Sequence, residues 1–252
     1  MSTNEAALAM CSAIQKVATG PEYSKDLSYE ESLAAMEYIL QDDADPVQAA
    51  VFFIALRMKR ETMDEFKGIL QALKSRTDTV EAPVDELVDN ADPYDGYTRG
   101  LPVSSFLPAT LAAAGVPAFI QGLNEVGPKN GVTPYKIFKS LGKSVEMSSS
   151  GAAAQLDDAD AGWAYLDQSS FCKPLHDLLP LRSRIIKRQA LTNLEVLHRP
   201  ITARKQTHLL TGYVHKAYPP IYAEVARFSG FDSAMIVRGV EGGYYPVPAT
   251  SR

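Results

Sequence analysis

Cysteines, an excess of charge of one sign and long apolar runs are all scarce in this sequence. The 252 residues include two cysteines, Cys11 and Cys172, whose positions fit neither a zinc-ligand pattern nor a disulfide framework. Such a pair is typical of a protein in a reducing cytoplasm. The histidines show no metal-ligand spacing either, so no metal site is predicted. These histidines are His176, His198, His208 and His215.

Signals for export and membrane insertion are missing as well. The N-terminus has no basic stretch before an apolar one, as a signal peptide would have, and no run is long and apolar enough to span a bilayer. The formal net charge of −5 excludes a chain that attracts nucleic acid with its whole surface, but it permits a local basic face. We therefore expect a cytoplasmic protein without a membrane anchor.

Residues 1–76 carry the pattern of several short helices. Two capping boxes, each a hydroxyl residue followed three positions later by a glutamate, mark helix starts at Ser28 and Thr62. Asp45 followed by Pro46 marks another start, because proline at the first helical position loses no hydrogen bond. Apolar residues recur behind these starts at helical spacing. No pattern in this part indicates catalysis, so we expect a packing or dimerisation domain.

The central stretch of the chain, residues 87–122, reads as strand, loop, helix and strand. In such a unit the loop lies at the carboxyl end of a parallel sheet, where α/β proteins bind ligands. A loop that grips pyrophosphate needs several glycines, so that backbone N–H groups can surround the phosphates. The loop at 92–96, DPYDG, has instead one glycine, one proline and two carboxylates that repel anions. Its position is that of a ligand loop, but its residues do not suit phosphate.

Strand and helix signals alternate in the rest of the chain, which predicts an α/β fold. We expect a small helical domain, residues 1–76 with part of 160–200, and a domain over 77–252 whose mainly parallel sheet is flanked by helices. The elements expected after the central stretch are a helix over 133–141, a strand over 143–147, a flexible linker at 148–151, a mainly helical segment over 213–229 and a strand over 234–237.

One segment resembles a known family. The stretch AVFFIALRMKRETMDEF at 50–66 resembles the N-terminal helical domain of anthranilate phosphoribosyltransferases and pyrimidine nucleoside phosphorylases, of glycosyltransferase family 3. Later landmarks keep the family's order: loops at 89–96 and 127–133, an Arg-rich segment at 182–188 and a strand end at 240–242. The resemblance covers nearly the whole chain and implies the two-domain fold. Because family members usually run longer, it also implies that the last part of the α/β domain is missing.

The functional motifs of that family are mostly replaced. Its glycine-rich loop for phosphoribosyl diphosphate falls on residues 90–96, where one Asp-Gly pair is retained, and its Lys-His-Gly-Asn-Arg run retains only Gly122. Its acidic pair, which holds magnesium, falls on Tyr244-Tyr245. Two phenols cannot replace two carboxylates as ligands of a hard cation. The resemblance therefore implies degenerate phosphoribosyl-diphosphate and magnesium sites.

A sister branch of the family lacks the same motifs. It keeps a Tyr-Asx-Gly loop, here residues 94–96, and a Glu-Gly-x-x-Tyr strand end, here residues 241–245, and this chain resembles that branch best. The branch forms homodimers and is associated with nucleic-acid binding rather than transfer. The resemblance thus implies a homodimer through the helical domain and a partner that is nucleic acid or another polyanion.

Two groups of residues are candidate sites. The first group, at the strand-end loops, is expected to line a ligand cleft, although Lys129 fits a simple loop lysine as well. The second is a basic helix face, on which Arg182 and Arg188 match the family's anthranilate-side arginines. Guanidinium groups on one face suit phosphates, while the alternative is a solvated helix paired with acids. The cleft residues are Tyr94, Asp95, Gly96, Gln121, Gly122 and Lys129, and the anion-binding residues are Arg182, Arg184, Lys187 and Arg188.

Three functions stay open on the sequence. The first is a non-catalytic binder of nucleic acid or another polyanion on a transferase fold, and the second is a phosphoribosyl or glycosyl transferase with a remodelled site. The third is a dimeric interaction subunit. Only the second requires magnesium and phosphoribosyl diphosphate. Because the glycines and the acids are missing, we expect the first function, without a cofactor and without activity as an anthranilate phosphoribosyltransferase.

Overall fold

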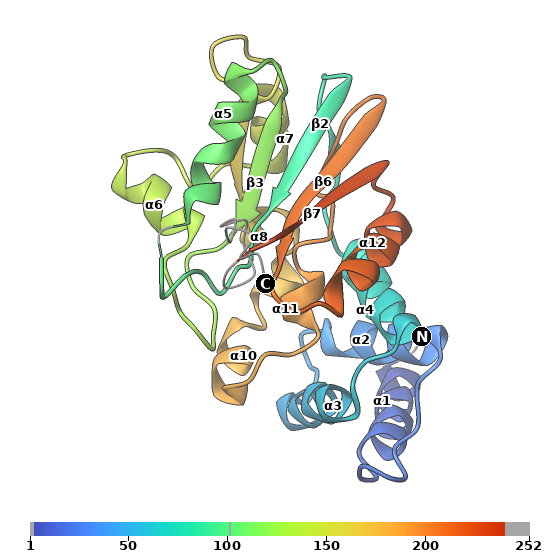
Figure 1. Ribbon diagram of the computed structural model, residues 1–252. Coiled ribbons are helices and arrows are strands. Elements are labelled where there is room, and N and C mark those ends of the chain that lie inside the picture. Colours follow the sequence, from blue (N-terminus) through green and yellow to red (C-terminus); the bar gives the residue numbers. More distant parts are fainter. Residues whose placement is uncertain (1–2, 101, 240–252) are drawn as a thin grey trace, which may run out of the picture. The chain divides into compact units, whose positions relative to one another are not determined.

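The computed structural model describes residues 3–100 and 102–239, which form two compact units. Figure 1 shows the chain coloured along the sequence, with the early helices in blue. The helical unit comprises the described residues up to Thr77 together with Cys172–His198, and the α/β unit comprises Asp78–Phe171 and the described residues from Arg199 onward.

Short helices with well-defined starts make up the helical unit. Ser28 Oγ accepts a hydrogen bond from the Glu31 N–H while the Glu31 carboxylate accepts one from the Ser28 N–H, and Thr62 with Glu65 repeats this arrangement. Asp45 caps the helix between them. These three predicted starts are confirmed. The helices are α1 (Thr3–Val17), α2 (Tyr29–Ile39), α3 (Pro46–Lys59), α4 (Met63–Ser75), α9 (Lys173–His176), α10 (Leu179–Ile185) and α11 (Leu191–Leu194).

Helices α2 and α4 pack at very close range. A Cβ atom on Gly68 would lie 2.4 Å from the carbonyl oxygen of Tyr29, so only glycine allows the two backbones to approach this closely. The predicted apolar face of α4 is buried. Glu65 is buried beside it, where its carboxylate accepts a hydrogen bond from the Leu27 N–H and pairs with Lys59 at 3.0 Å. The core of this unit is therefore packed tightly around α2 and α4.

The α/β unit contains one sheet of five parallel strands. Their order is β4 (Trp163–Asp167), β3 (Ala118–Gly122), β2 (Glu86–Ala91), β6 (Gln206–Tyr213) and β7 (Ser233–Arg238). The chain places β3 and β4 on one side of β2, and β6 and β7 on its other side. The order thus reverses between β2 and β6, and open α/β sheets bind ligands outside the carboxyl ends of the strands at such a reversal.

Helices flank this sheet, and the predicted fold class is confirmed. Helix α7 packs on β4 and helix α12 packs on β7, which lies next to it in Figure 1. No helix among residues 3–100 and 102–239 has the length and apolar character needed to cross a bilayer. The remaining elements are η1 (Val103–Phe106), α5 (Leu107–Ala113), α6 (Pro134–Ser140), α7 (Ser149–Gln155), α8 (Gln168–Phe171), α12 (Tyr218–Ser229) and the pair β1 (Val80–Glu81) and β5 (Ile201–Thr202).

Some elements differ from the sequence-based expectation. Residues 143–147 form no strand, because Val145 is buried in an aromatic cluster around Phe138 without pairing to a neighbouring strand. Residues 148–151 are no linker, because Ser148 caps α7 by accepting a hydrogen bond from the Gly151 N–H at 3.1 Å. Strands β4 and β6 were not expected. The Tyr-Tyr pair and the strand end at 241–245 lie outside the described residues.

Candidate functional site

The candidate site begins where β2 ends, at the reversal of strand order. Thr211 on the neighbouring strand β6 donates a hydrogen bond from its hydroxyl to the carbonyl oxygen of Ala91 at 2.9 Å, which joins the two carboxyl ends. Residues 92–97 form the loop that follows β2, and residues 127–133 form the loop that lies against it. We call these two segments the β2 loop and the β3 loop.

The side chains of the β2 loop point into the protein. Asp92 is 1% exposed, and it accepts hydrogen bonds from the Tyr97 hydroxyl at 2.8 Å and the Ser104 hydroxyl at 2.7 Å. Asp95 is equally buried and forms an ion pair with Lys129 at 3.1 Å. The Lys129 ammonium also lies 5.7 Å from the centre of the Tyr97 ring, within reach of a cation–π interaction. Both carboxylates therefore bind groups of the protein itself.

Backbone hydrogen bonds close the β2 loop onto the β3 loop. The Tyr97 N–H donates to the Val132 carbonyl at 2.9 Å, and the Val132 N–H donates back to Tyr97 at 2.8 Å. The Gly131 N–H donates to the Asp95 carbonyl at 2.9 Å, and the Gly96 N–H donates within its own loop at 3.1 Å. These four amides are consequently not directed at a ligand, as those of a phosphate-binding loop must be.

Two glycines make this docking sterically feasible. A Cβ atom on Gly131 would lie 2.6 Å from the backbone nitrogen of Tyr97. A Cβ atom on Gly96 would lie 2.7 Å from the Val132 carbonyl oxygen, and Gly96 also has a φ of +72°, which L side chains rarely adopt. The one glycine of the β2 loop is therefore required for contact between loops, and not for close approach of a phosphate.

A buried polar chain runs from the β2 loop to the middle of β2. The Tyr94 hydroxyl donates to Gln121 Oε1 at 2.7 Å, and Gln121 Nε2 donates to both carboxylate oxygens of Asp89 at 2.9 Å. Burial raises the pKa of Asp89 to about 8, against the hydrogen bonds from Gln121, and raises the pKa of Asp92 to about 6. Asp89 was missed by the sequence analysis, although a carboxylate inside an apolar strand is a signal of this kind of network.

Neutral groups with unused hydrogen-bonding capacity lie next to Asp92. Asn90 Nδ2 donates to the Ser104 carbonyl at 2.9 Å, while Asn90 Oδ1 is buried without a hydrogen-bond partner in the described structure. The buried Ser105 hydroxyl has none there either. Buried polar groups are normally satisfied, so a water molecule or a neutral polar ligand suits this position better than an anion does.

The predicted cleft residues do come together, but they face inward. Tyr94, Asp95, Gly96, Gln121 and Gly122 are all buried, and the Lys129 side chain is 14% exposed. Their hydrogen bonds connect the loops and the strands of the α/β unit. As a group they stabilise the carboxyl edge of the sheet.

The predicted basic face is smaller than expected. Arg182 is buried on α10, where its guanidinium donates to both carboxylate oxygens of Glu195 at 2.6 and 2.9 Å. In such a bidentate ion pair the guanidinium charge is neutralised by a carboxylate inside the protein. Glu195 is the only acid within residues 182–205, and the sequence did not show which of the cations it pairs with. Arg182 is therefore a structural residue and is unavailable to a polyanion.

The end of α10 changes the arrangement of the other cations. The helix ends at Ile185, and Ile186 adopts a φ of +65°. Arg188 thus lies beyond the helix, and the expectation that it stacks above Arg184 on one helical face was wrong. Arg184 and Lys187 are exposed, whereas Arg188 is half-buried.

No metal-binding cluster of three or more His, Cys, Asp or Glu side chains occurs within residues 3–100 and 102–239. His198 is buried, with its Nδ1 2.6 Å from the Thr77 hydroxyl, and burial lowers its pKa to about 3. Cys172 is buried as well, and burial raises the pKa of its thiol. These two residues therefore have the environment of core residues and not of ligands or nucleophiles.

Comparison with known proteins supports the resemblance noted in the sequence. Residues 12–77 match the helical bundle domain of a glycosyl transferase family. An anthranilate phosphoribosyltransferase of Erythrobacter litoralis is 30% identical over 216 residues, which cover 86% of this chain and 63% of the relative. This chain is therefore similar in sequence to anthranilate phosphoribosyltransferases over most of its length. An uncharacterized protein of Aquifex aeolicus is 28% identical over 227 residues, which cover 89% of this chain and 66% of the relative.

Solved structures of anthranilate phosphoribosyltransferases share the fold of this chain. The crystal structure of the anthranilate phosphoribosyltransferase from Thermus thermophilus has a TM-score of 0.68 at 18% identity and covers 94% of this chain. The Saccharomyces cerevisiae enzyme in complex with PRPP and Mg has a TM-score of 0.70 at 15% identity. The chain spans 67% of both structures, and just under two thirds of the two relatives named above.

The raised pKa of Asp89 predicts a loss of stability at alkaline pH. In the folded chain Asp89 holds its proton up to a pH of about 8, whereas the unfolded chain releases it near a pH of about 4, so the free energy of unfolding falls as the pH rises through this window. Between pH values of about 6.5 and 8.5, the free energy of unfolding of the wild type should fall by roughly 2 kcal/mol more than that of the Asp89→Asn variant. His198 and Asp92 titrate in both proteins, so their contributions cancel in the comparison.

Urea unfolding at several pH values measures this difference. The exposed Asp157→Asn is the matched control, and its curve should run parallel to that of the wild type. Parallel curves for the wild type and Asp89→Asn would show that Asp89 is already ionised in the folded protein.

Proposed function

We propose that this chain is a non-catalytic binding protein built on the transferase fold. The observation that carries this proposal is the closed β2 loop. Its two carboxylates and the amides of Gly96 and Tyr97 are all satisfied by groups of the protein. Transfer of a phosphoribosyl group needs donors and cation ligands that are directed at diphosphate before the reaction begins. To provide them here, the contact between the β2 and β3 loops would have to open.

Catalytic inactivity is the first consequence. Purified protein given anthranilate, phosphoribosyl diphosphate and magnesium should show no turnover above background, measured by the loss of anthranilate fluorescence. Gly131→Ala, which separates the two loops, should not restore it, because the opened β2 loop still has one glycine and a proline and cannot surround diphosphate with backbone amides. Turnover in the wild type that is lost on changing Lys129 to Ala would establish the remodelled transferase instead.

The partner that we propose is nucleic acid, bound through the exposed cations at the end of α10 and just beyond it. Arg184 and Lys187 are exposed there and Arg188 is half-exposed, while the acid of this segment, Glu195, is buried against Arg182. The chain as a whole is acidic, so attraction must be local. At physiological salt the Debye length is about 8 Å, which restricts the attraction to phosphates next to these side chains. We therefore expect the chain to bind nucleic acid weakly and without base specificity.

Removing two of these cations should weaken binding in a salt-dependent way. Arg184→Ala/Lys187→Ala should reduce the affinity for a labelled single-stranded oligonucleotide equally for all base sequences. Each lost phosphate contact lowers the slope of log affinity against log salt by about 0.7, so the double variant should lose about 1.4. Fluorescence anisotropy at salt concentrations from about 50 to about 200 mM measures both quantities.

A matched control removes the same charge elsewhere. Lys25 and Lys216 are exposed, and Lys25→Ala/Lys216→Ala should leave affinity and slope within error of the wild type. Equal losses in both double variants would reveal a general charge effect without a defined face. No binding by the wild type at low salt would favour the interaction-subunit function.

We further propose that the chain forms a homodimer through α3. Val47, Val51 and Met58 are 67%, 41% and 78% exposed, and their spacing of four and seven residues places them on one face of that helix. A row of exposed apolar side chains is a typical association surface. A dimer would also present two basic segments and so increase the affinity for a polyanion by avidity.

Charges placed on this face should dissociate the dimer. We expect light scattering to give twice the chain mass of 27.4 kDa for the wild type and 27.4 kDa for Val51→Glu/Met58→Glu. The control, Val214→Glu/Met235→Glu, alters two exposed apolar residues of the α/β unit and should remain dimeric. A monomeric wild type, or a variant that still dimerises, would exclude α3 as the interface.

A further inference from the structure

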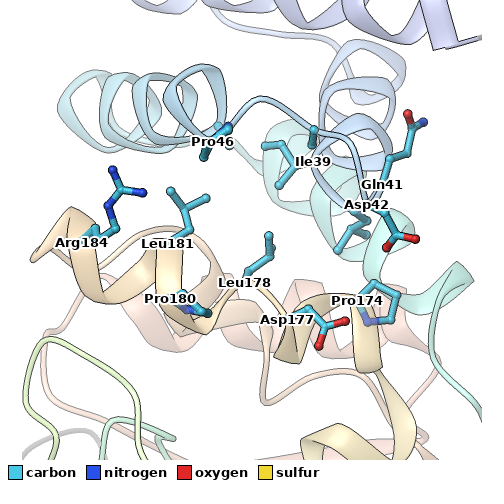
Figure 2. A pocket seen from close by; sticks show the side chains of 13 residues that line it. Ile39, Gln41, Asp42, Pro46, Pro174, Asp177, Leu178, Pro180, Leu181 and Arg184 are labelled. Atoms are coloured by element: carbon cyan, nitrogen blue, oxygen red, sulfur yellow. The ribbon is translucent and has the colours of Figure 1, made fainter.

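The helical unit contains a groove that shares only Arg184 with the functions proposed above. It runs between the segment that joins α2 to α3 and the helices α9 and α10, and Figure 2 shows its lining side chains. Its volume is about 290 Å³, comparable to on the order of ten water molecules and near the lower end of ligand sites. All of its lining residues belong to the helical unit. A small molecule therefore fits it better than a folded partner does.

The middle of the groove is apolar and rigid. Ile39, Leu178 and Leu181 are directed toward the space between the helices in Figure 2. Pro46 and Pro180, which also line it, stand in the first turns of α3 and α10, where proline fixes the backbone angle φ. A wall that changes little on binding avoids much of the entropy loss that ordering a flexible site would cause.

Opposite charges stand at the two ends. Arg184 lies at one end, and Asp42 and Asp177 lie at the other (Figure 2). Asp177 is paired with Lys173 at 2.6 Å, whereas Arg184 and Asp42 have no ion-pair partner among the described side chains. The charges of Arg184, Lys173, Asp42 and Asp177 sum to zero. The groove therefore favours a ligand that is neutral overall and carries one charge at each end.

We propose that this groove binds a small zwitterion whose carboxylate and ammonium groups are separated by an apolar chain. The carboxylate pairs with the Arg184 guanidinium, the ammonium group pairs with the Asp42 carboxylate, and the chain between them contacts Leu178 and Leu181. The free ends of a short apolar peptide and an ω-amino acid share this chemistry. The proposal does not depend on nucleic-acid binding, since Asp42 repels phosphate and Lys187 does not line the groove.

Calorimetric titration of the full chain with ω-amino acids tests the proposal. A series of about four to eight carbons, centred on 6-aminohexanoate, locates the length that spans the two charges. Hexanoate and hexylamine have an apolar chain of nearly the same length but a single charge each. Because a charge-assisted hydrogen bond changes an equilibrium by about tenfold or more, the best ω-amino acid should bind at least about tenfold more tightly than either analogue.

Variants at the two ends assign each charge. Arg184→Gln should reduce the affinity for the ω-amino acid and for hexanoate about tenfold but leave hexylamine unchanged, and Asp42→Asn should do the reverse. Both side chains are exposed, so the fold should be retained, which thermal unfolding checks. Arg57→Gln, on an exposed residue of α3 outside the groove, should change none of the three affinities.

Several results would overturn the proposal. These are equal affinities for the ω-amino acid and its single-charge analogues, absence of binding by the ω-amino acids and by apolar dipeptides alike, and equal effects of Arg57→Gln and Arg184→Gln. Binding of longer apolar dipeptides alone, with the same response to both end variants, would support the proposal and identify the peptide as the ligand form. Lys187→Ala separates the two functions, because it should weaken oligonucleotide binding and leave the zwitterion unaffected.

Discussion

The contact between the β2 loop and the β3 loop determines the chemistry of this protein. Paired backbone hydrogen bonds between Tyr97 and Val132 hold it, and Gly96 and Gly131 allow the approach. Once the loops are in contact, Asp92 and Asp95 have no access to water and must find partners within the protein, because an unpaired buried carboxylate is strongly unfavourable. Tyr97, Ser104 and Lys129 are those partners. The loop therefore stabilises the sheet edge at the position where the fold offers a ligand site.

Pairing of buried charges follows the same constraint in the helical unit. Arg182 with Glu195, and Lys59 with Glu65, are ion pairs in which the carboxylate is fully buried. Breaking such a pair leaves an uncompensated charge, so each partner is fixed once the other is buried. Asp89 differs, because its partner is the neutral amide of Gln121. A neutral amide stabilises a buried carboxylate less than a cation would. Asp89 therefore keeps its proton up to a higher pH, which avoids a buried charge without a charged partner.

The parts of the fold that depend on local interactions were predictable from the sequence. A capping box needs only two residues three positions apart, and those at Ser28 and Thr62 formed as expected. Strands β4 and β6 were not predictable in this way. A strand within a parallel sheet reads as a short apolar run that resembles a piece of buried helix, and β6 carries polar residues as well. Its identity as a strand depends on pairing with β2, far away in the sequence.

The candidate site was predictable in its location but not in its orientation. Strand order places ligand loops at the carboxyl edge, which is a rule of topology and needs no side-chain coordinates. Whether Tyr94 and Asp95 face a ligand or the protein depends on the β3 loop, more than thirty residues further along the chain. The same holds for Arg182, whose burial depends on its ion pair with Glu195 and could not be read from the sequence around it.

The left-handed backbone conformation of Ile186 ends α10 and so determines where the neighbouring cations lie. A β-branched residue at positive φ is an unfavourable conformation, of order 1–3 kcal/mol, and persists only where the surrounding structure imposes it. Here it ends α10 directly after Ile185, so that Arg184 stays on the helix at the groove while Lys187 follows beyond its end. Continuation of the helix by one more turn would bring Arg188 above Arg184 and join the two into a single basic face. The turn at Ile186 therefore keeps Arg184 at the groove and leaves Lys187 out of the groove's lining.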